Sequence, residues 1–421
     1  MRTVGLLLCA LLFLTACDST RNLSSTNLSH IYKKSESPIH PEFQVFHAGD
    51  SSTTVYFRML KEELLYTKKD NNLEFTTKVK LSYALHEAFE SEVILDSGSV
   101  KVIELKNAND SKYISGQIKV KTRQRTLTLL EITVLDMHRG VFNTHFLRIN
   151  RKDDRSGQNF LVKSIETGKP AFSNHLHLNQ PSRIFHNSSA TTLYGRFYKR
   201  EFPIAPPPFA LYNPRPFQYE ADSLFVLQAG ENNEFVVSVD RPGFYHFTLD
   251  SSDREGFTMF HFARDYPQTT TIDDLLLPLR FITTKREFEA LTTSDTPKKA
   301  LDEFWLNNAN NPERARELIR NYYNRVQDAN KYFSSYMEGW KTDRGMMYVV
   351  FGPPNIIYKS THAETWIYGE ENNYLSINVN FIKVENPFSD NDFRLNRSPI
   401  YKNGWYRMVD SWRQGRILTR E

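Results

Sequence analysis

Cysteine is almost absent from this chain. Cys9 and Cys17 are the only two among 421 residues, and both lie close to the N-terminus. The body of the protein after residue 17 therefore has no disulfide, no thiol nucleophile and no thiolate ligand for a metal. Without disulfides it must be stabilised by ordinary hydrophobic cores, and roughly 400 residues are enough for two or three of them.

Excess charge, long apolar runs and catalytic motifs are missing as well. The formal net charge of +4 is too small to indicate a nucleic-acid partner. Beyond residue 13, no apolar stretch approaches the roughly 20 residues that span a bilayer. The HExxH, GxSxG and Walker motifs do not occur. The sequence thus predicts no catalytic residue, no metal and no cofactor, and we expect a protein without enzymatic activity.

The N-terminus indicates export. Arg2 precedes an apolar run at residues 4–13, which is too short to cross a bilayer as a stable helix. Leu14-Thr15-Ala16-Cys17 follows and resembles the lipobox of bacterial lipoproteins. We therefore expect residues 1–16 to be a signal peptide and Cys17 to carry several acyl chains, each methylene of which contributes about 0.8 kcal/mol to membrane binding. The alternative is an ordinary secretory signal in which this cysteine is accidental.

Two observations bear on the choice of membrane. Asp18 follows the cysteine, and in enteric bacteria this residue favours retention at the inner membrane. No run of acidic residues follows it, although some other phyla use such a run for display at the cell surface. We expect the outer membrane, with the protein facing the periplasm.

Hydrophobic periodicity divides the rest of the chain. Residues 17–41 are rich in Ser, Asn, Thr and Lys, which predicts a flexible tether behind the lipid. Alternating strands predict a β-sandwich at residues 42–151 and a second β-rich domain at 152–268. Helical periodicity appears only afterwards, so residues 269–421 are expected to form an α+β domain of helices packed on a short antiparallel sheet.

The second β-rich region contains six prolines between residues 203 and 216. Such a segment cannot lie in a central strand. One interpretation is a rigid polyproline loop that docks a partner, with Pro206, Pro207 and Pro208 as the candidate residues. The simpler alternative is a structural loop packed by its own Phe202, Phe209 and Tyr212.

Helix signals are strongest in the last region. Residues 298–307 predict one helix, and Asn311-Pro312-Glu313 predicts the start of a second one of about 24 residues, with Asn311 as its N-cap. Apolar residues at steps of three and four support this second helix. Tyr401 to Trp412 carry a further apolar stripe, which predicts a third helix.

The densest segment of the chain is GWKTDRGMMYVVFGPP, residues 339–354. Thr342 and Asp343 are turn formers, and Arg344 is expected to pair with an acid such as Asp302 or Glu303. Residues 346–351 are apolar at every position, which predicts a strand buried on both faces and ended by Gly352-Pro353-Pro354. Strands are also predicted at 365–368 and 374–381, the latter with one wet face. The functional alternative is that Asp343 acts as a catalytic acid and Arg344 as an anion clamp.

This segment carries a family resemblance. Gly339, Trp340, Thr342, Asp343, Arg344 and Gly345 resemble the signature of the GWxTD domain family. Other landmarks agree in order and spacing: Phe304-Trp305, Tyr322-Tyr323-Asn324-Arg325-Val326, Ala329-Asn330, Phe351-Gly352-Pro353-Pro354 and Glu364-Thr365-Trp366-Ile367-Tyr368. The similarity covers about residues 269–416 and departs from the family at Met346-Met347, where a basic residue is expected. It implies an exported bacterial lipoprotein and brings no catalytic activity.

A weaker similarity concerns the order of elements. A helix, a strand ending in Gly-Pro and a strand bearing Trp-x-Tyr also resemble the small lipoprotein subunit of outer-membrane β-barrel assembly machines. In that subunit a short sheet packed on helices serves as a docking surface.

Histidine and tryptophan supply the remaining candidate sites. His175 and His177 have strand spacing and could both face a metal, but two ligands are too few, and exposed strand histidines are the simpler interpretation. His246 and His261 are expected at the edge of a core. All five tryptophans lie between residues 305 and 412, and Trp340 and Trp366 are the two that could be exposed to stack on a sugar.

Two functions follow from this pattern. The first is a non-enzymatic, lipid-anchored scaffold or accessory subunit of an outer-membrane complex, for β-barrel assembly or transport, with other envelope proteins or an outer-membrane β-barrel as partners. The second is a module that binds or degrades cell-wall or dietary glycan, which requires a cleft with convergent carboxylates and exposed indoles. The absence of gathered catalytic residue types favours the first.

Overall fold

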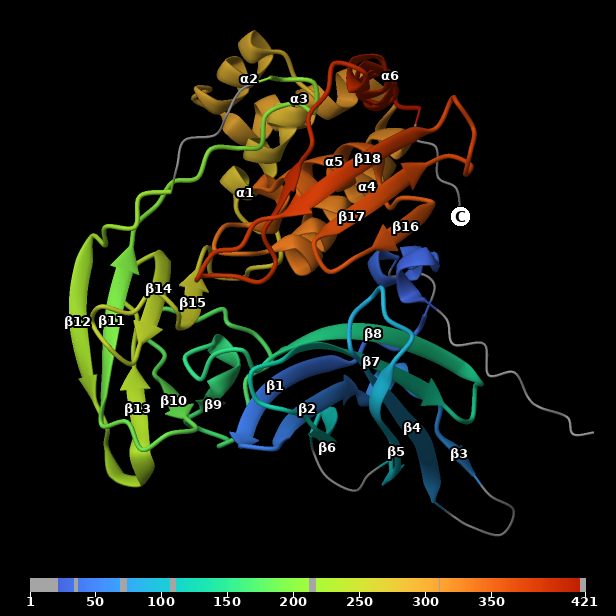
Figure 1. The fold of residues 1–421 in the computed structure, drawn as a ribbon. Coiled ribbons are helices and arrows are strands. Elements are labelled where there is room, and N and C mark those ends of the chain that lie inside the picture. Colours follow the sequence, from blue (N-terminus) through green and yellow to red (C-terminus); the bar gives the residue numbers. More distant parts are fainter. Residues whose placement is uncertain are drawn as a thin grey trace, which may run out of the picture.

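The computed structural model describes residues 22–33, 37–68, 74–106, 111–211, 217–309 and 311–416. Three parts of the chain each surround a hydrophobic core, and they lie against one another (Figure 1). Two of them are built from antiparallel sheets, and the third combines helices with a small antiparallel sheet. The expected succession of β-rich regions followed by an α+β region is confirmed.

The first part contains two sheets. The smaller has the order β1-β2-β6. In the larger, β7 and then β8 follow on one edge of β4, β5 pairs with the opposite edge, and β3 pairs only with the first two residues of β4. The strands are β1 (Glu42–Gly49), β2 (Ser52–Leu60), β3 (Thr67–Lys68), β4 (Phe75–His86), β5 (Ile94–Leu105), β6 (Tyr113–Lys121), β7 (Leu127–Asp136) and β8 (Val141–Asn150), with a short 3₁₀ helix η4 (Lys61–Glu63).

Alternation of side chains fixes the faces of these sheets. In β4, Val79 and Leu81 are buried while Lys78 and Lys80 on the opposite face are partly exposed. The inward residues of both sheets form one core that contains Val55, Phe57, Leu130 and Ile132, among others. The period-two pattern in the sequence therefore predicts this core correctly.

The second part is also made of two sheets, ordered β13-β10-β9 and β12-β11-β14-β15. The strands are β9 (Phe160–Ser164), β10 (Ser182–His186), β11 (Thr192–Tyr198), β12 (Ser223–Gln228), β13 (Glu234–Val237), β14 (Gly243–Thr248) and β15 (Phe257–His261), with the 3₁₀ helices η5 (Gly157–Asn159) and η6 (Glu231–Asn233). Their shared core includes Phe160, Phe235 and Phe247.

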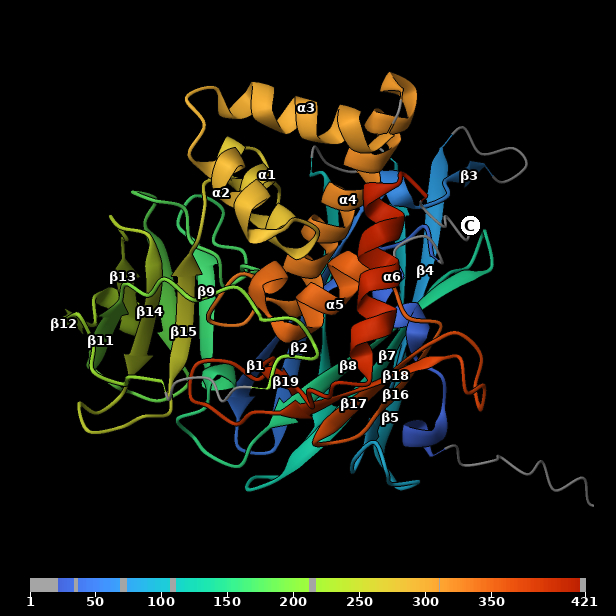
Figure 2. The ribbon, with the colours of Figure 1, turned by 90° about the horizontal axis from the view of Figure 1, so that it is seen from above.

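The third part places helices against a sheet of order β16-β17-β18-β19. Its elements are α1 (Ile272–Leu276), η7 (Leu277–Phe281), α2 (Lys285–Thr292), α3 (Pro297–Ala309), α4 (Pro312–Phe333), η8 (Gly339–Lys341), α5 (Asp343–Phe351), β16 (Ile356–Lys359), β17 (Ala363–Tyr368), β18 (Ile377–Lys383), β19 (Phe393–Leu395) and α6 (Tyr401–Arg413). Figures 1 and 2 show α4, α5 and α6 on one face of this sheet. Of the described helices, none is both long and apolar enough to cross a membrane.

Local sequence explains where these helices begin. The Asn311 side chain accepts a hydrogen bond from the Arg314 amide at 2.8 Å, so the predicted N-cap of α4 is confirmed. Thr271 and Thr284 start α1 and α2 with reciprocal capping boxes that the sequence pattern did not single out.

The strand predicted at 374–381 begins only at Ile377, because Tyr374 and Leu375 lie in an exposed turn. Its wet face is confirmed by exposed Asn378 and Asn380.

Residues 22–33 are not a flexible tether, contrary to the sequence prediction. They form the 3₁₀ helices η1 (Leu23–Ser25) and η2 (Ser29–Tyr32), and Leu23, Leu28 and Tyr32 are buried. The Leu28 amide donates to the Ile357 carbonyl at 2.8 Å, which attaches this segment to β16. The polar composition of this segment predicts a flexible chain, but three buried apolar side chains are enough to hold a short polar segment on a neighbouring domain.

Buried neutral histidines predict how the fold responds to acid. His47 and His246 are each 1% exposed, and in each ring one nitrogen contacts a threonine hydroxyl while the other contacts a backbone carbonyl. Burial lowers the pKa of both to about 4, and it does the same for His145, His175 and His186. Between about pH 6.5 and pH 4, these histidines therefore bind protons in the unfolded chain but not in the folded state.

We therefore expect stability that is fully present above pH 6.5 and declines as the pH falls toward 4. For His47 and His246 the loss at pH 5 is about 2 kcal/mol each. Urea unfolding followed by circular dichroism at pH 7.5 and pH 5 measures it, and His246→Gln should show a smaller difference between the two pH values. An equal free energy of unfolding at both pH values would contradict this account.

Candidate functional site

Residues 346–351 form a helix, and the prediction of a strand there is wrong. They belong to α5, which the Thr342 hydroxyl caps by accepting a hydrogen bond from the Gly345 amide at 3.1 Å. Gly352 ends the helix with a φ of 83°. All residues from Arg344 to Phe351 are buried, so the helix is apolar on every side. A helix enclosed on all sides has no polar stripe, and hydrophobic periodicity cannot distinguish it from a buried strand.

The two glycines of the signature allow close backbone contact. A Cβ on Gly339 would lie 2.1 Å from the Ala329 carbonyl oxygen, and one on Gly345 would lie 1.9 Å from the Gly339 carbonyl oxygen. Both distances are far below any real carbon–oxygen contact. Gly339 therefore lets the turn pack directly on the backbone of α4, and Gly345 lets α5 pack directly on the backbone of that turn.

Trp340 and Thr342 complete the turn. Trp340 is 6% exposed, packs edge-on against Phe281, and its amide donates to Asn330 Oδ1 at 3.1 Å. The Thr342 hydroxyl also donates to the Gly339 carbonyl at 2.7 Å. The Trp340 amide thus ties the turn to α4, its ring packs on η7, and the Thr342 hydroxyl holds the turn itself together.

Asp343 is a structural ion-pair partner in this geometry. Its Oδ2 accepts hydrogen bonds from the Leu395 amide at 2.8 Å and from Arg397 Nη1 at 3.0 Å, and its Oδ1 is paired with Arg397 Nη2. The side chains of both partners are about 10% exposed. With these contacts made, Asp343 is committed to joining α5 to β19 and the segment that follows.

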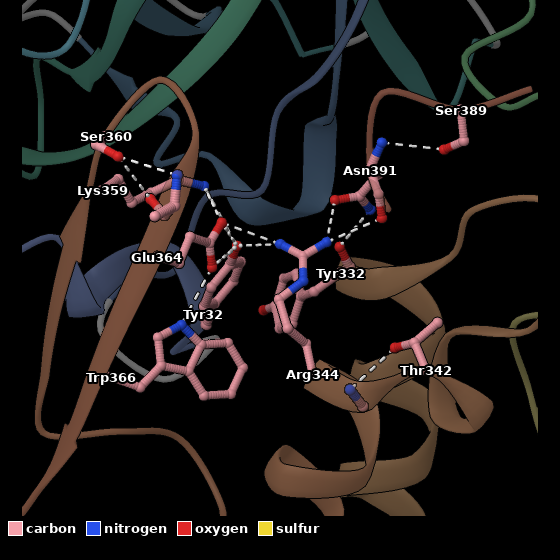
Figure 3. A network of polar contacts seen from close by, with 12 residues as sticks. Tyr32, Tyr332, Thr342, Arg344, Lys359, Ser360, Glu364, Trp366, Ser389 and Asn391 are labelled. Atoms are coloured by element: carbon pink, nitrogen blue, oxygen red, sulfur yellow. Dashed lines mark hydrogen bonds and ion pairs between the residues drawn. The ribbon is translucent and has the colours of Figure 1, made fainter. Parts of the chain in front are cut away.

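Arg344 is fully buried and pairs with Glu364 of β17, not with Asp302 or Glu303 as expected. Its Nη1 lies 3.0 Å from Glu364 Oε1, and the two side chains are 2% and 0% exposed (Figure 3). On the other side, Arg344 Nη2 donates to the Asn391 carbonyl at 3.0 Å and to the Asn391 side chain. The guanidinium also lies over the Phe393 ring, 4.0 Å from its centroid. Asp302 and Glu303 sit instead on α3, where Glu303 is an exposed partner of Lys299.

Three further groups surround the Glu364 carboxylate. Lys359 Nζ lies 2.7 Å from Oε1, the Trp366 indole N–H donates to Oε2 at 3.1 Å, and the Tyr32 hydroxyl donates to Oε1 at 3.1 Å (Figure 3). Burial alone would raise the pKa of Glu364, but the charges of Lys359 and Arg344, together with the hydrogen bonds from Lys359 and Trp366, lower it to about 2. The carboxylate is therefore ionised throughout the physiological range.

The sequence-based interpretation did not identify Tyr32, Lys359, Asn391 or Arg397 as partners of the signature. In the sequence, Glu364 stands out only as a landmark of the family resemblance. One signal was available for it: Glu364 and Trp366 are two residues apart in a strand, so a buried Trp366 places the acid on the buried face. Tyr32 gave no such signal, since its partner is 332 positions away in the chain.

The other candidate residues are placed as follows. Trp305, Trp405 and Trp412 are buried, and so are Trp340 and Trp366, the two that could have been exposed for stacking on a sugar. His175 and His177 do lie together, with ring centroids 5.4 Å apart, and His261 stacks on His175 at 5.3 Å. Among the described residues, however, no three His, Cys, Asp or Glu side chains are arranged to hold a metal. His246 and His261 are fully buried instead of lying at a core edge.

The proline loop packs on the third part of the chain. Pro206 and Pro208 accept hydrogen bonds from Arg397 and from the Ser398 amide, and the Ala205 amide donates to the Lys341 carbonyl of the signature turn. Phe209 lies against Tyr406 of α6. Pro207 remains exposed, whereas Pro208 is buried. Tyr212 and the prolines at 214 and 216 lie outside the described residues, as do the signal peptide and Cys17.

A cavity of about 360 Å³ lies where the three parts of the chain meet. Phe43, Gln158, Glu255, Phe388 and Asp390 are among its lining residues. Burial raises the pKa of Glu255, with the nearby charge of Asp153 adding to the effect. Asp390 is committed to an ion pair with Arg148 at 2.9 Å, so the cavity does not present two free carboxylates for glycoside chemistry.

Gly345 offers a direct test of the structural role of the signature. Alanine usually stabilises a helix by about 1 kcal/mol relative to glycine. Gly345→Ala should instead lower the free energy of unfolding by about 3 kcal/mol, because the added methyl overlaps the Gly339 carbonyl. Tryptophan fluorescence during urea unfolding reports on this part of the chain, since all five tryptophans lie there.

Gly49→Ala is the matched control, because nothing lies within 4 Å of a Cβ at that position. It should change stability by no more than about 0.5 kcal/mol. A Gly345→Ala protein as stable as the parent would show that the close contact between α5 and the preceding turn is not required.

One comparison with known proteins supports the family resemblance of the C-terminal part of the chain. A family model described as "GWxTD domain" matches residues 243–414, which begins in β14 and ends just after α6. No curated protein sequence matches the chain. A solved structure of the C-terminal 282-residue fragment of intimin, in complex with the intimin-binding domain of the translocated intimin receptor, aligns with 86% of this chain and 94% of its own at 11% identity. Its TM-score is 0.14, so this alignment carries no conclusion about fold or function.

Proposed function

With the C-terminal part of the chain, residues 243–414, identified as a GWxTD domain, we propose that this protein is a lipid-anchored, non-enzymatic scaffold subunit of the bacterial cell envelope. The GWxTD domain is not a known catalytic family. The chain is proposed to be held by acyl groups on Cys17 at the outer membrane and to face the periplasm. Its partners are proposed to be other envelope proteins or an outer-membrane β-barrel.

One observation carries the non-enzymatic part of this proposal. The polar side chains of the signature are all engaged by the chain itself: Thr342 caps α5, Asp343 binds Arg397, and Arg344 binds Glu364. A catalytic acid or an anion clamp needs a group that is open to a ligand. The most distinctive residues of the domain are thus used for packing.

Contacts between the three parts support a rigid body. Arg148 of β8 pairs with Asp390, and Asn187 after β10 donates to the His47 carbonyl of β1 at 3.0 Å. The proline loop adds the contacts of Ala205 and Pro206 to the signature region. Rigid placement of several domains is what a scaffold requires, since it fixes the distance between the membrane and a docking face.

The geometry also fits attachment at the N-terminus. Asn22, the first described residue, lies only five positions after Cys17. At about 3.5 Å per residue, an anchor at Cys17 would lie within roughly 18 Å of the folded body. The body would therefore be held close to the membrane and would not extend on a long tether.

The tryptophans do not support the glycan-binding alternative. Stacking on a sugar ring needs an exposed indole face, and all five tryptophans are at most 6% exposed. We therefore propose the scaffold alone.

Cys17→Ser tests the anchor. The variant should move from the membrane fraction to the soluble periplasmic fraction, and mass spectrometry of the parent should find an acylated N-terminus at Cys17. Cys9→Ser is the matched control, because it removes the other cysteine from the proposed signal peptide and should leave membrane binding unchanged. Cys17→Ser protein that stays with membranes and a parent without acyl groups would both contradict the proposal.

Extraction of the anchored protein from its own membranes in mild detergent tests the scaffold. A β-barrel or another lipoprotein should accompany it in a fixed ratio. A protein that emerges alone from cross-linked membranes would contradict the assignment as a stable subunit.

A further inference from the structure

One end of the larger sheet in the first part presents an unusual outer face. Lys78 and Lys80 of β4 point away from the core, since the residues between and beside them, Val79 and Leu81, are buried. Strand register places Ile103 opposite Lys78 and Lys101 opposite Lys80. On the other side, Leu135 is opposite Lys80, and Phe142 is opposite Leu135. Directly opposed residues share one face of an antiparallel pair, so these side chains form a single surface.

We name this surface the basic sheet face and define it by Lys78, Lys80, Lys101, Ile103 and Phe142. Its apolar members are unusually open to solvent: Ile103 is 64% exposed and Phe142 is 62% exposed. Leu105 and Met137 at its margin are 40% and 42% exposed. Large apolar side chains grouped at this level of exposure mark an interaction surface more often than scattered single ones do.

The lysines of this face have no acidic counterpart. Within the described residues, Lys78, Lys80 and Lys101 form no ion pair. Two nearby acids belong to the opposite face of the sheet: Glu104 stands opposite the buried Thr77 and pairs with Lys61, and Asp136 is buried opposite Val79. A third, Glu74, is exposed just before β4 begins, four residues from Lys78. Two further lysines, Lys68 and Lys106, lie over the Phe75 ring at the same end of the sheet.

We propose that the basic sheet face binds an anionic phospholipid surface. Lysines attract the headgroup phosphates, while Ile103 and Phe142 can enter the boundary between headgroups and acyl chains. None of the five residues that define the face is acidic. The acid of β7 on the same side of the sheet, Glu131, lies further along the strand opposite Ala84, where it pairs with His86. Figure 1 shows strands β3, β4 and β5 on the side of the first part that lies away from helices α1–α6.

This inference deepens the proposed membrane location, because a second contact would orient a body that the acyl chains alone would leave free to rotate. It does not depend on the lipid anchor for its test. The chain from residue 18 onward contains every described residue and no acylated cysteine, so binding through the basic sheet face can be measured separately.

The experiment is sedimentation of that chain with vesicles of phosphatidylcholine alone or with 30% phosphatidylglycerol added. We expect binding to the anionic vesicles only, and weaker binding as salt is raised. Replacing all three lysines, K78Q/K80Q/K101Q, should reduce the partition coefficient by about a hundredfold. Phe142→Ser together with Ile103→Ser should abolish the binding that persists at high salt.

The control carries the same charge change elsewhere: K285Q/K298Q/K299Q alters three exposed lysines on α2 and α3 and should retain at least half of the parent's binding. The proposal is overturned if the parent does not bind anionic vesicles, or if both lysine variants bind equally. Binding to an acidic polypeptide such as polyglutamate without binding to vesicles would assign the face to an acidic protein instead. Circular dichroism of each variant verifies that it is folded, and a surface variant that unfolded would also count against the open, unpartnered face described here.

Discussion

The fold of the C-terminal domain depends on one buried ion pair, between Arg344 and Glu364. Removing two charges from water is costly, and the attraction between them repays that cost only if their remaining hydrogen-bonding groups are satisfied. Here they are: Lys359, Tyr32 and Trp366 complete the surroundings of the carboxylate, and Asn391 occupies the other side of the guanidinium. The cluster therefore requires all of these segments to be in place at once.

That requirement connects parts of the chain that are far apart in sequence. Tyr32 comes from the N-terminal segment, Arg344 from α5 and Glu364 from β17. The close backbone contact between Gly345 and the preceding turn fixes the position of α5, and from that position the Arg344 side chain reaches Glu364 in the sheet. Since residues 22–33 begin just after the proposed lipid site, the position of the body relative to a membrane would be set by the same cluster that stabilises the domain.

The sequence predicted some of this structure and could not predict the rest, for physical reasons. Helix α4 was found because Asn311, Pro312 and an apolar stripe leave a local signal. Helix α5 was mistaken for a strand because it is buried on every side and its composition has no period. The expected pairing of Arg344 with Asp302 or Glu303 failed because an ion pair between distant segments leaves no trace in spacing. The packing of Tyr32 in a polar segment is hidden for the same reason.

A double-mutant cycle on Arg344 and Glu364 tests the central claim most directly. Urea unfolding of the parent, Arg344→Met, Glu364→Gln and the double variant, followed by tryptophan fluorescence, gives the four free energies. Each single variant should lose about 3–5 kcal/mol. Glu364→Gln leaves Arg344 buried without its carboxylate, and Arg344→Met leaves Glu364 with Lys359 as its one remaining ion-pair partner. The double variant should lose at least about 2 kcal/mol less than the sum of the two. Single variants within about 0.5 kcal/mol of the parent, or losses that simply add, would contradict the account.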